Sequence, residues 1–141
     1  GAGIIRCEEV IKDADGTITE LRGGLEPESR PGMEGANRKV KGTIHWVSAA
    51  HAVPAEIRLY DRLFSVPNPD DESEGKTYRD YLNPESRRTV TGYVEPAAAS
   101  ATPEQSFQFE RTGYFVADRR DHTEAKPVFN RSVTLRDTWS A

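Results

Sequence analysis

The side chains able to perform covalent or metal chemistry are few in this sequence, and their spacing fits no catalytic motif. His45, His51 and His122 lack zinc-ligand spacing relative to one another and to Cys7. No G-x-S-x-G segment presents a serine nucleophile, and no glycine-rich phosphate loop lies between a strand and a helix. We therefore expect no catalytic residue, no metal and no bound cofactor in this chain, and we favour a binding function.

Positive charge and aromatic rings gather in the middle of the chain, although its 141 residues carry a formal net charge of −4. Cationic side chains contact phosphates and rings stack on bases, so this combination suits RNA recognition. The alternative is that the rings fill a small core. The cations are Arg38, Lys39, Lys41, Arg58 and Arg62, and the rings are Trp46, Tyr60, Tyr93, Phe107, Phe109, Tyr114 and Phe115.

Composition narrows the class of protein. No apolar run approaches the roughly 20 residues that a membrane-spanning helix needs, and no signal peptide is apparent. The single cysteine excludes an internal disulfide, which fits a reducing compartment, and we expect a cytoplasmic protein. With 9 Pro and 11 Gly, the chain is expected to form one loop-rich domain or two very small ones.

The elements that must position these side chains are mostly strands. The first 22 residues predict a hairpin, with strands at 4–12 and 17–22 joined by a turn at Asp13–Gly16. Residues 23–37 have the composition of a loop. Residues 40–47 predict a strand that places Ile44 and Trp46 on one face, and we expect Trp46 in the core with His45 beside it.

The second half of the chain also alternates between apolar and polar residues. We expect strands at 55–64, with Ile57, Leu59 and Leu63 facing inward, at 89–95, and at 127–137. A further strand at 106–118 is expected to bend near Gly113. Residues 65–88 form an acidic insertion with a short helix at 77–82 and a mobile part at 70–80, and residues 96–105 form a flexible loop. This pattern predicts an all-β fold, a small antiparallel β-barrel.

Several long blocks closely resemble the C-terminal anticodon-binding region of bacterial glutaminyl-tRNA synthetase. They are IIRCEEVIKDADGTITEL, KVKGTIHWVSAAHAVPAEIRLYDRLFSVPNP, LNPES, FQFERTGYF and KPVFNRSVTLRDTW. The resemblance implies a barrel of the ribosomal protein L25 type. It also implies a domain division, with a distal anticodon-binding barrel at 1–110 and strands returning toward a second, incomplete barrel at 111–141.

The same resemblance implies a parent enzyme that ligates glutamine to tRNA-Gln with ATP. The ATP-binding catalytic domain belongs to the same full-length polypeptide and is absent here, so this chain alone is expected to be inactive. Its expected partners are the tRNA-Gln anticodon and that catalytic domain, with no membrane, and we expect a monomer. Two alternatives from other classes are a stand-alone L25-like barrel that binds ribosomal RNA, and a protein-interaction barrel with no RNA role.

In the family, the FQFER block holds a glutamine and an arginine at the central uridine of the anticodon, and these match Gln108 and Arg111. An amide both donates to and accepts from a pyrimidine edge, and a guanidinium serves base and phosphate together. Residues three apart on a regular strand point to opposite faces, so the pair requires a bulge or bend near Glu110–Gly113. The alternative for Arg111 is a simple surface ion pair with Glu110.

Overall fold

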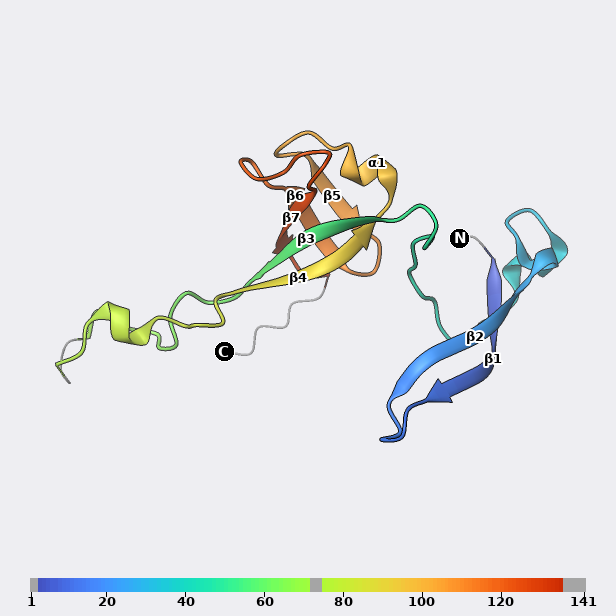
Figure 1. The fold of residues 1–141 in the computed structure, drawn as a ribbon, viewed down its shortest axis with the longest axis horizontal. Helices are drawn as coiled ribbons and strands as arrows, with labels where there is room; N and C mark the ends of the chain where they lie inside the picture. The colour runs from blue at the N-terminus through green and yellow to red at the C-terminus, as the bar shows by residue number, and fades with distance from the viewer. Residues whose placement is uncertain (1–2, 72–74, 136–141) are drawn as a thin grey trace. The chain divides into compact units, whose positions relative to one another are not determined.

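The computed structural model describes residues 3–71 and 75–135, and the elements of this part of the chain are shown in Figure 1. They comprise seven strands, one short α-helix and three 3-10 helices, so the expected all-β class is confirmed. The chain divides after Thr43 into two units, Gly1–Thr43 and Ile44–Ala141. No helix among these described residues is long and apolar enough to cross a membrane.

The first unit is built on the expected hairpin. Strands β1 (Ile4–Lys12) and β2 (Ile18–Glu26) pair antiparallel. The turn is held by Asp13, whose Oδ1 accepts the backbone N–H groups of Asp15 at 3.0 Å and Thr17 at 2.9 Å. Gly16 adopts a φ of +83°, which glycine tolerates at little cost. Strand β2 continues through residues that we expected in a loop, and two 3-10 helices follow, η1 (Pro27–Ser29) and η2 (Glu34–Asn37).

The second unit is a five-stranded mixed sheet with the order β4-β3-β7-β6-β5. Its strands are β3 (Val53–Tyr60), β4 (Arg87–Val94), β5 (Ser106–Phe109), β6 (Gly113–Ala117) and β7 (Val128–Val133). Strands β3 and β7 pair in parallel, whereas the other neighbours are antiparallel. Because β4 and β5 are the two ends of this order, the described residues do not form the closed antiparallel barrel that we expected.

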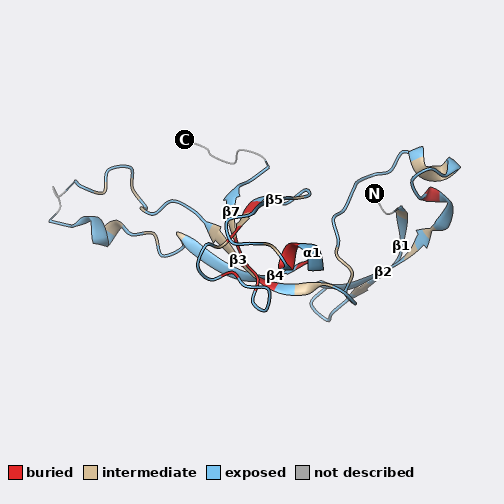
Figure 2. Ribbon diagram, turned by 90° about the horizontal axis from the view of Figure 1, so that it is seen from above, coloured by how far each residue is buried: buried red, intermediate tan, exposed pale blue. Residues whose placement is uncertain are grey.

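The core of this unit is formed by buried side chains of β3, β4, α1, β6 and β7, and Figure 2 marks buried residues in red along the ribbon. Phe129 is fully buried, and the rings of Phe107 and Phe109 pack against it with centroid distances of 5.8 and 5.3 Å. The 96–105 segment is not simply the flexible loop that we expected. It begins with helix α1 (Pro96–Ala99), whose small residues Ala98 and Ala99 are buried in this core.

The prediction of a strand at 40–47 is wrong, because these residues form no strand in the structure. Ile44 and Trp46 are 62% and 59% exposed, so the prediction of a buried Trp46 is also wrong, and His45 is exposed rather than beside the core. The β-branched pattern of this segment suits a strand, but a strand also needs a hydrogen-bonded neighbour. The strands of the sheet pair with one another and leave this segment unpaired.

The β3–β4 connection continues as a paired arm beyond the sheet. The N–H of Asp61 donates to the Ser86 carbonyl at 2.9 Å, and that of Ser65 to the Tyr81 carbonyl at 2.8 Å. The predicted short helix is present as η3 (Tyr78–Tyr81), capped by Thr77. Leu63 lies outside β3 and is exposed rather than inward-facing. The expected mobility of residues 70–80 falls partly on 72–74, which lie outside the described residues.

Candidate nucleic-acid interface

Arg58, one of the cations that we considered for RNA contact, is engaged by carboxylates of its own protein. Its guanidinium donates to Glu56 at 2.7 Å, to Asp118 at 3.1 Å and to Asp121 at 2.6 Å. The Arg58 side chain is only 14% exposed. Because the Arg58 guanidinium already donates to carboxylates of β3 and of the turn after β6, Arg58 has a structural role and is not available to a phosphate.

The same network lowers the pKa of one of these acids. The Asn130 side-chain amide donates to Asp118 at 2.7 Å, and this bond, with backbone N–H groups from the following turn, holds the pKa of Asp118 at about 2. Tyr60 extends the network by donating its hydroxyl to Asn130 at 2.9 Å. The hydrogen bonds that Arg58 donates to Asp121 and Glu56 raise its pKa above the ordinary value. These groups therefore fix β3, β7 and the turn after β6 to one another.

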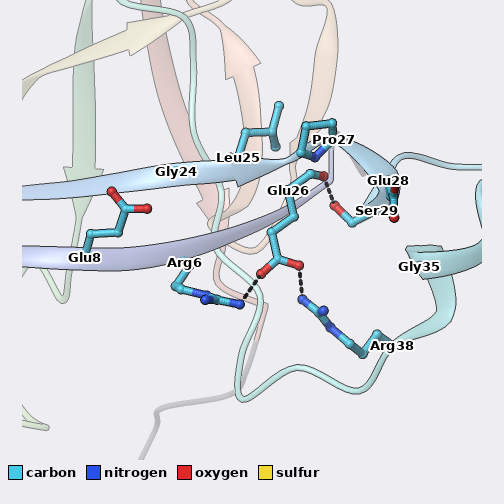
Figure 3. A pocket seen from close by; sticks show the side chains of 10 residues that line it. All are labelled: Arg6, Glu8, Gly24, Leu25, Glu26, Pro27, Glu28, Ser29, Gly35 and Arg38. Carbon is cyan, nitrogen blue, oxygen red and sulfur yellow. Dashed lines mark hydrogen bonds and ion pairs between the residues drawn. The ribbon is translucent and has the colours of Figure 1, made fainter.

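The first unit contains a pocket of about 450 Å³ whose cations are likewise neutralised. Figure 3 shows Glu26 between two arginines, Arg6 at 3.1 Å and Arg38. The Arg38 hydrogen bond, followed by the charges of both arginines, lowers the pKa of Glu26. Since one carboxylate takes both guanidinium groups, and Glu8 and Glu28 also line the pocket, this site is poorly suited to an anion.

The aromatic residues separate into two groups. The rings of Phe107, Phe109 and Phe115 face the core, and the centroids of the last two are 4.7 Å apart in a stacked arrangement. Because these three rings pack within the core, they are not offered to a base. Of the rings that the sequence analysis considered for stacking, four are exposed and available to a base: Trp46, Tyr60, Tyr93 and Tyr114.

The β5–β6 hairpin places Gln108 and Arg111 on the surface. Phe107 and Phe109 alternate inward along β5, so Gln108 points outward from this edge strand, and its cross-strand partner is the exposed Tyr114. Arg111 lies in the following turn and is exposed. Its Nε is 3.9 Å from Glu110 Oε1, a loose pair of two exposed side chains. Such a pair contributes little and leaves the guanidinium accessible.

The single bent strand that we expected at 106–118 is instead two strands, β5 and β6, and a tight turn between them reverses the chain. The Thr112 N–H donates to the Phe109 carbonyl at 2.9 Å, and Arg111 adopts a φ of +61°. Left-handed backbone is costly for a residue with a side chain, and it often accompanies functional positions. Gly113 follows with a φ of +153°, and a Cβ there would lie 2.9 Å from the Val133 carbonyl oxygen. The turn is therefore held close to the end of β7.

A further pair of cations, Arg88 on β4 and Arg131 on β7, was not singled out by the sequence analysis. Both line a groove of about 850 Å³ at the end of the sheet, together with residues of β3 and the segment after β7. No ion pair involves either residue within 3–71 and 75–135. Neighbouring positions on separate strands are visible only from the strand register, so no local motif marks this groove.

The histidines and acids offer no metal site in the part of the chain described. No group of three or more His, Cys, Asp or Glu side chains is close enough there to hold an ion. His122 is buried and structural: its Nδ1 accepts the Val128 N–H at 3.1 Å, and its Nε2 lies 3.1 Å from the Ala101 carbonyl. This geometry fits the tautomer protonated at Nε2. His45 and His51 are exposed.

Comparison with known proteins finds a matching family and similar relatives that cover nearly the whole chain. Residues 43–118 match the family described as tRNA synthetases class I (E and Q), anti-codon binding domain. Over 140 residues, 99% of this chain, the sequence is 85% identical to "Glutamine--tRNA ligase" of Xanthomonas axonopodis pv. citri (strain 306). It is 71% identical over 139 residues to the protein of the same name from Xylella fastidiosa (strain M12). The chain spans 24% of the length of each of these relatives.

The matched region contains β3, β4, α1, β5 and β6, and therefore both Gln108 and Arg111. It covers more than half of the chain, and the expected resemblance to this family is confirmed. The chain belongs to the family of anticodon-binding domains of class I tRNA synthetases for glutamate and glutamine.

Proposed function

We propose that this chain is the part of a glutamine–tRNA ligase that binds the anticodon of tRNA-Gln. The family match supports anticodon binding, and the name shared by relatives at 71–85% identity supports glutamine as the amino acid. The same names favour this function over a stand-alone ribosomal-RNA-binding barrel. The observation that carries the proposal is the β5–β6 hairpin, which presents Gln108 from β5 and Arg111 from the following left-handed turn within the matched region.

The two side chains would divide the recognition of the central anticodon base. Gln108 offers one acceptor and two donors, so it pairs with the donor and acceptor edge of an unstacked pyrimidine. Arg111 offers five N–H donors, which reach a base edge and a phosphate together. Tyr114, opposite Gln108, adds an exposed ring face for stacking. The turn at Glu110–Gly113 brings these groups to one end of the sheet.

The catalytic steps belong to the rest of the proposed full-length protein. Its catalytic domain would use ATP to activate glutamine and would transfer it to the tRNA, whereas this chain supplies recognition alone. We also propose a cytoplasmic monomer, and we retain the assignment of 1–110 to a distal barrel and 111–141 to strands of a proximal one. Within this chain the proposed boundary falls in the β5–β6 turn.

The test is Arg111→Ala in the full-length ligase, assayed by aminoacylation of tRNA-Gln and of a tRNA substituted at the central anticodon base. We expect a lower kcat/KM for the cognate tRNA, equivalent to a loss of about 1–3 kcal/mol in transition-state stabilisation. The loss should be smaller for the substituted tRNA. Arg119→Ala is the matched control, because Arg119 is exposed with only a loose ion pair to Glu104. Equal losses on both tRNAs would reduce Arg111 to a positioning charge.

A further inference from the structure

The groove at the end of the sheet, here called the end groove, is lined by Arg88 and Arg131 on a face where the sheet otherwise packs its core. Arg88 pairs in register with Leu59, which shares its side of β3 with the buried Ile57. Arg131 follows the fully buried Phe129 by two positions on β7. Alternation therefore directs both arginines to the core side, just beyond the last layer of apolar side chains.

Arg131, half-buried on the core side of the sheet, breaks its apolar pattern without an evident gain in stability, and Arg88 is exposed at the edge of the same face. No carboxylate pairs with either guanidinium in 3–71 or 75–135. A cation that is partly removed from water and lacks a partner, as the half-buried Arg131 is, is unfavourable for folding. Violations of this kind concentrate at functional positions. The unpaired donors of Arg88 and Arg131 are thus suited to an anion from outside the sheet.

The end groove is continuous with the turn that holds Arg111. A Cβ placed on Gly113 would lie 2.9 Å from the carbonyl oxygen of Val133 and 3.7 Å from Cδ of Arg131. Val133 also lines the groove, and it pairs with Tyr114. The turn that carries Arg111 therefore lies beside Arg131 at the end of the sheet, whereas Gln108 points from the opposite face of the sheet.

The charge and size of the groove fit a polyanion. Its lining contains three arginines, Arg62, Arg88 and Arg131, against two carboxylates, Asp61 and Glu85. Asp61 already accepts the backbone N–H of Arg62 at 2.7 Å. The volume of about 850 Å³ and the apolar Leu59 and Val133 in the lining admit a sugar–phosphate unit.

We propose that the end groove binds the phosphate backbone of the anticodon loop through Arg88 and Arg131, next to the base held by Gln108 and Arg111. This inference rests on the proposed function. Phosphate contacts set the register of a nucleic acid and carry no sequence information themselves. The two arginines therefore contribute affinity and salt dependence, and the hairpin contributes selectivity.

The chain provides a matched control in the residue next to Arg88. Arg87 pairs with Tyr60 on the opposite face of β4, so Arg87→Gln removes the same charge from the same strand but not from the groove. Glutamine keeps much of the arginine stem, and Arg131→Gln therefore preserves most of the packing of that half-buried side chain. Melting temperatures of all variants report whether the sheet is intact.

The experiment measures the Kd of the full-length ligase for an RNA hairpin carrying the tRNA-Gln anticodon stem and loop, across salt concentrations of about 50–200 mM. We expect Arg88→Gln and Arg131→Gln together to weaken binding about tenfold, equally for the cognate hairpin and one substituted at the central base. The slope of log Kd against log salt should fall by about 0.7 for each phosphate that is no longer neutralised. Arg87→Gln should leave both the Kd and the slope unchanged.

Three results overturn the proposal. The first is that the groove substitutions leave the slope of log Kd against log salt unchanged. The second is that Arg87→Gln weakens binding as much as they do, which would indicate diffuse electrostatic attraction. The third is that the groove substitutions lower the melting temperature and spare RNA binding, which indicates a protein segment in the groove. Failure of the proposed function is distinct, because the unsubstituted protein would then bind the cognate and substituted hairpins equally.

Discussion

Arginines of the same five-stranded sheet differ in whether acidic side chains pair with them. Arg58, with its acids, is one set, and Arg88 and Arg131 are the other. Arg58 on β3 donates to three carboxylates and is 14% exposed, whereas Arg88 and Arg131, one register position away on the opposite face of the sheet, meet no acid in the described residues. The first set is complete without a partner molecule. The second set leaves donors available, and it lies beside the turn of Arg111. Charge alone therefore does not identify a binding surface, because the location of the nearest acids decides whether an arginine is structural.

The largest expected effect that tests this comparison is on folding. Arg58→Ala removes the common partner of Glu56, Asp118 and Asp121 and leaves the mostly buried charge of Asp118 without an ion pair. We expect the free energy of unfolding to fall by about 3 kcal/mol, measured by urea denaturation of this chain. Arg88→Ala in the same assay should change it by less than about 0.5 kcal/mol. Similar losses for both variants would remove the distinction between the two sets.

The sequence predicts much of the secondary structure where local chemistry decides it. The Asp13–Gly16 turn, the alternation of β3 and the helix after Thr77 are all marked by neighbouring residues, and each is confirmed. The prediction of a strand at 40–47 is wrong for a physical reason. An alternating pattern gives only a local preference for extended backbone, whereas the hydrogen-bonded neighbouring strand must come from elsewhere in the chain.

The candidate site shows the same limit more strongly. The acids that bind Arg58 lie 60 and 63 positions along the chain, apart from the local Glu56, so no spacing rule reveals that Arg58 is structural. The end groove is equally non-local, because its arginines come from β4 and β7 on either side of β3. Only the FQFER block was recognisable in advance, and the assignment of Gln108 and Arg111 as base contacts stays a prediction.

A second expected effect uses pH to test the structural set. The ordinary pKa of an aspartate is 3.8 and that of Asp118 is about 2, so the unfolded chain takes up this proton first as the pH falls. The stabilisation is therefore complete above about pH 4 and is lost toward pH 2, amounting to about 2 kcal/mol. Unfolding curves across this range should show it.

Asn130→Ala tests the physical cause of this acid dependence. The Asn130 amide is the largest contributor to the lowered pKa of Asp118, and its removal keeps the carboxylate itself. We expect a variant with a shallower loss of stability between pH 4 and pH 2. An unchanged acid dependence in Asn130→Ala would mean that Asp118 is not the group responsible.

The smallest expected effect separates stability from recognition at the turn beside the end groove. Arg111 adopts a φ of +61°, a conformation that costs a residue with a Cβ about 1 kcal/mol and glycine almost nothing. Arg111→Gly should therefore raise the free energy of unfolding by about 1 kcal/mol, while Arg111→Ala, which retains the Cβ, leaves it unchanged. Both variants lose the guanidinium, so both should weaken discrimination at the central anticodon base equally. A protein that gains stability when a surface arginine is removed has kept that arginine for a reason other than folding. Loss of stability in Arg111→Gly would show instead that the Arg111 side chain supports the turn, and its loose pair with Glu110 would then be the place to look for that support.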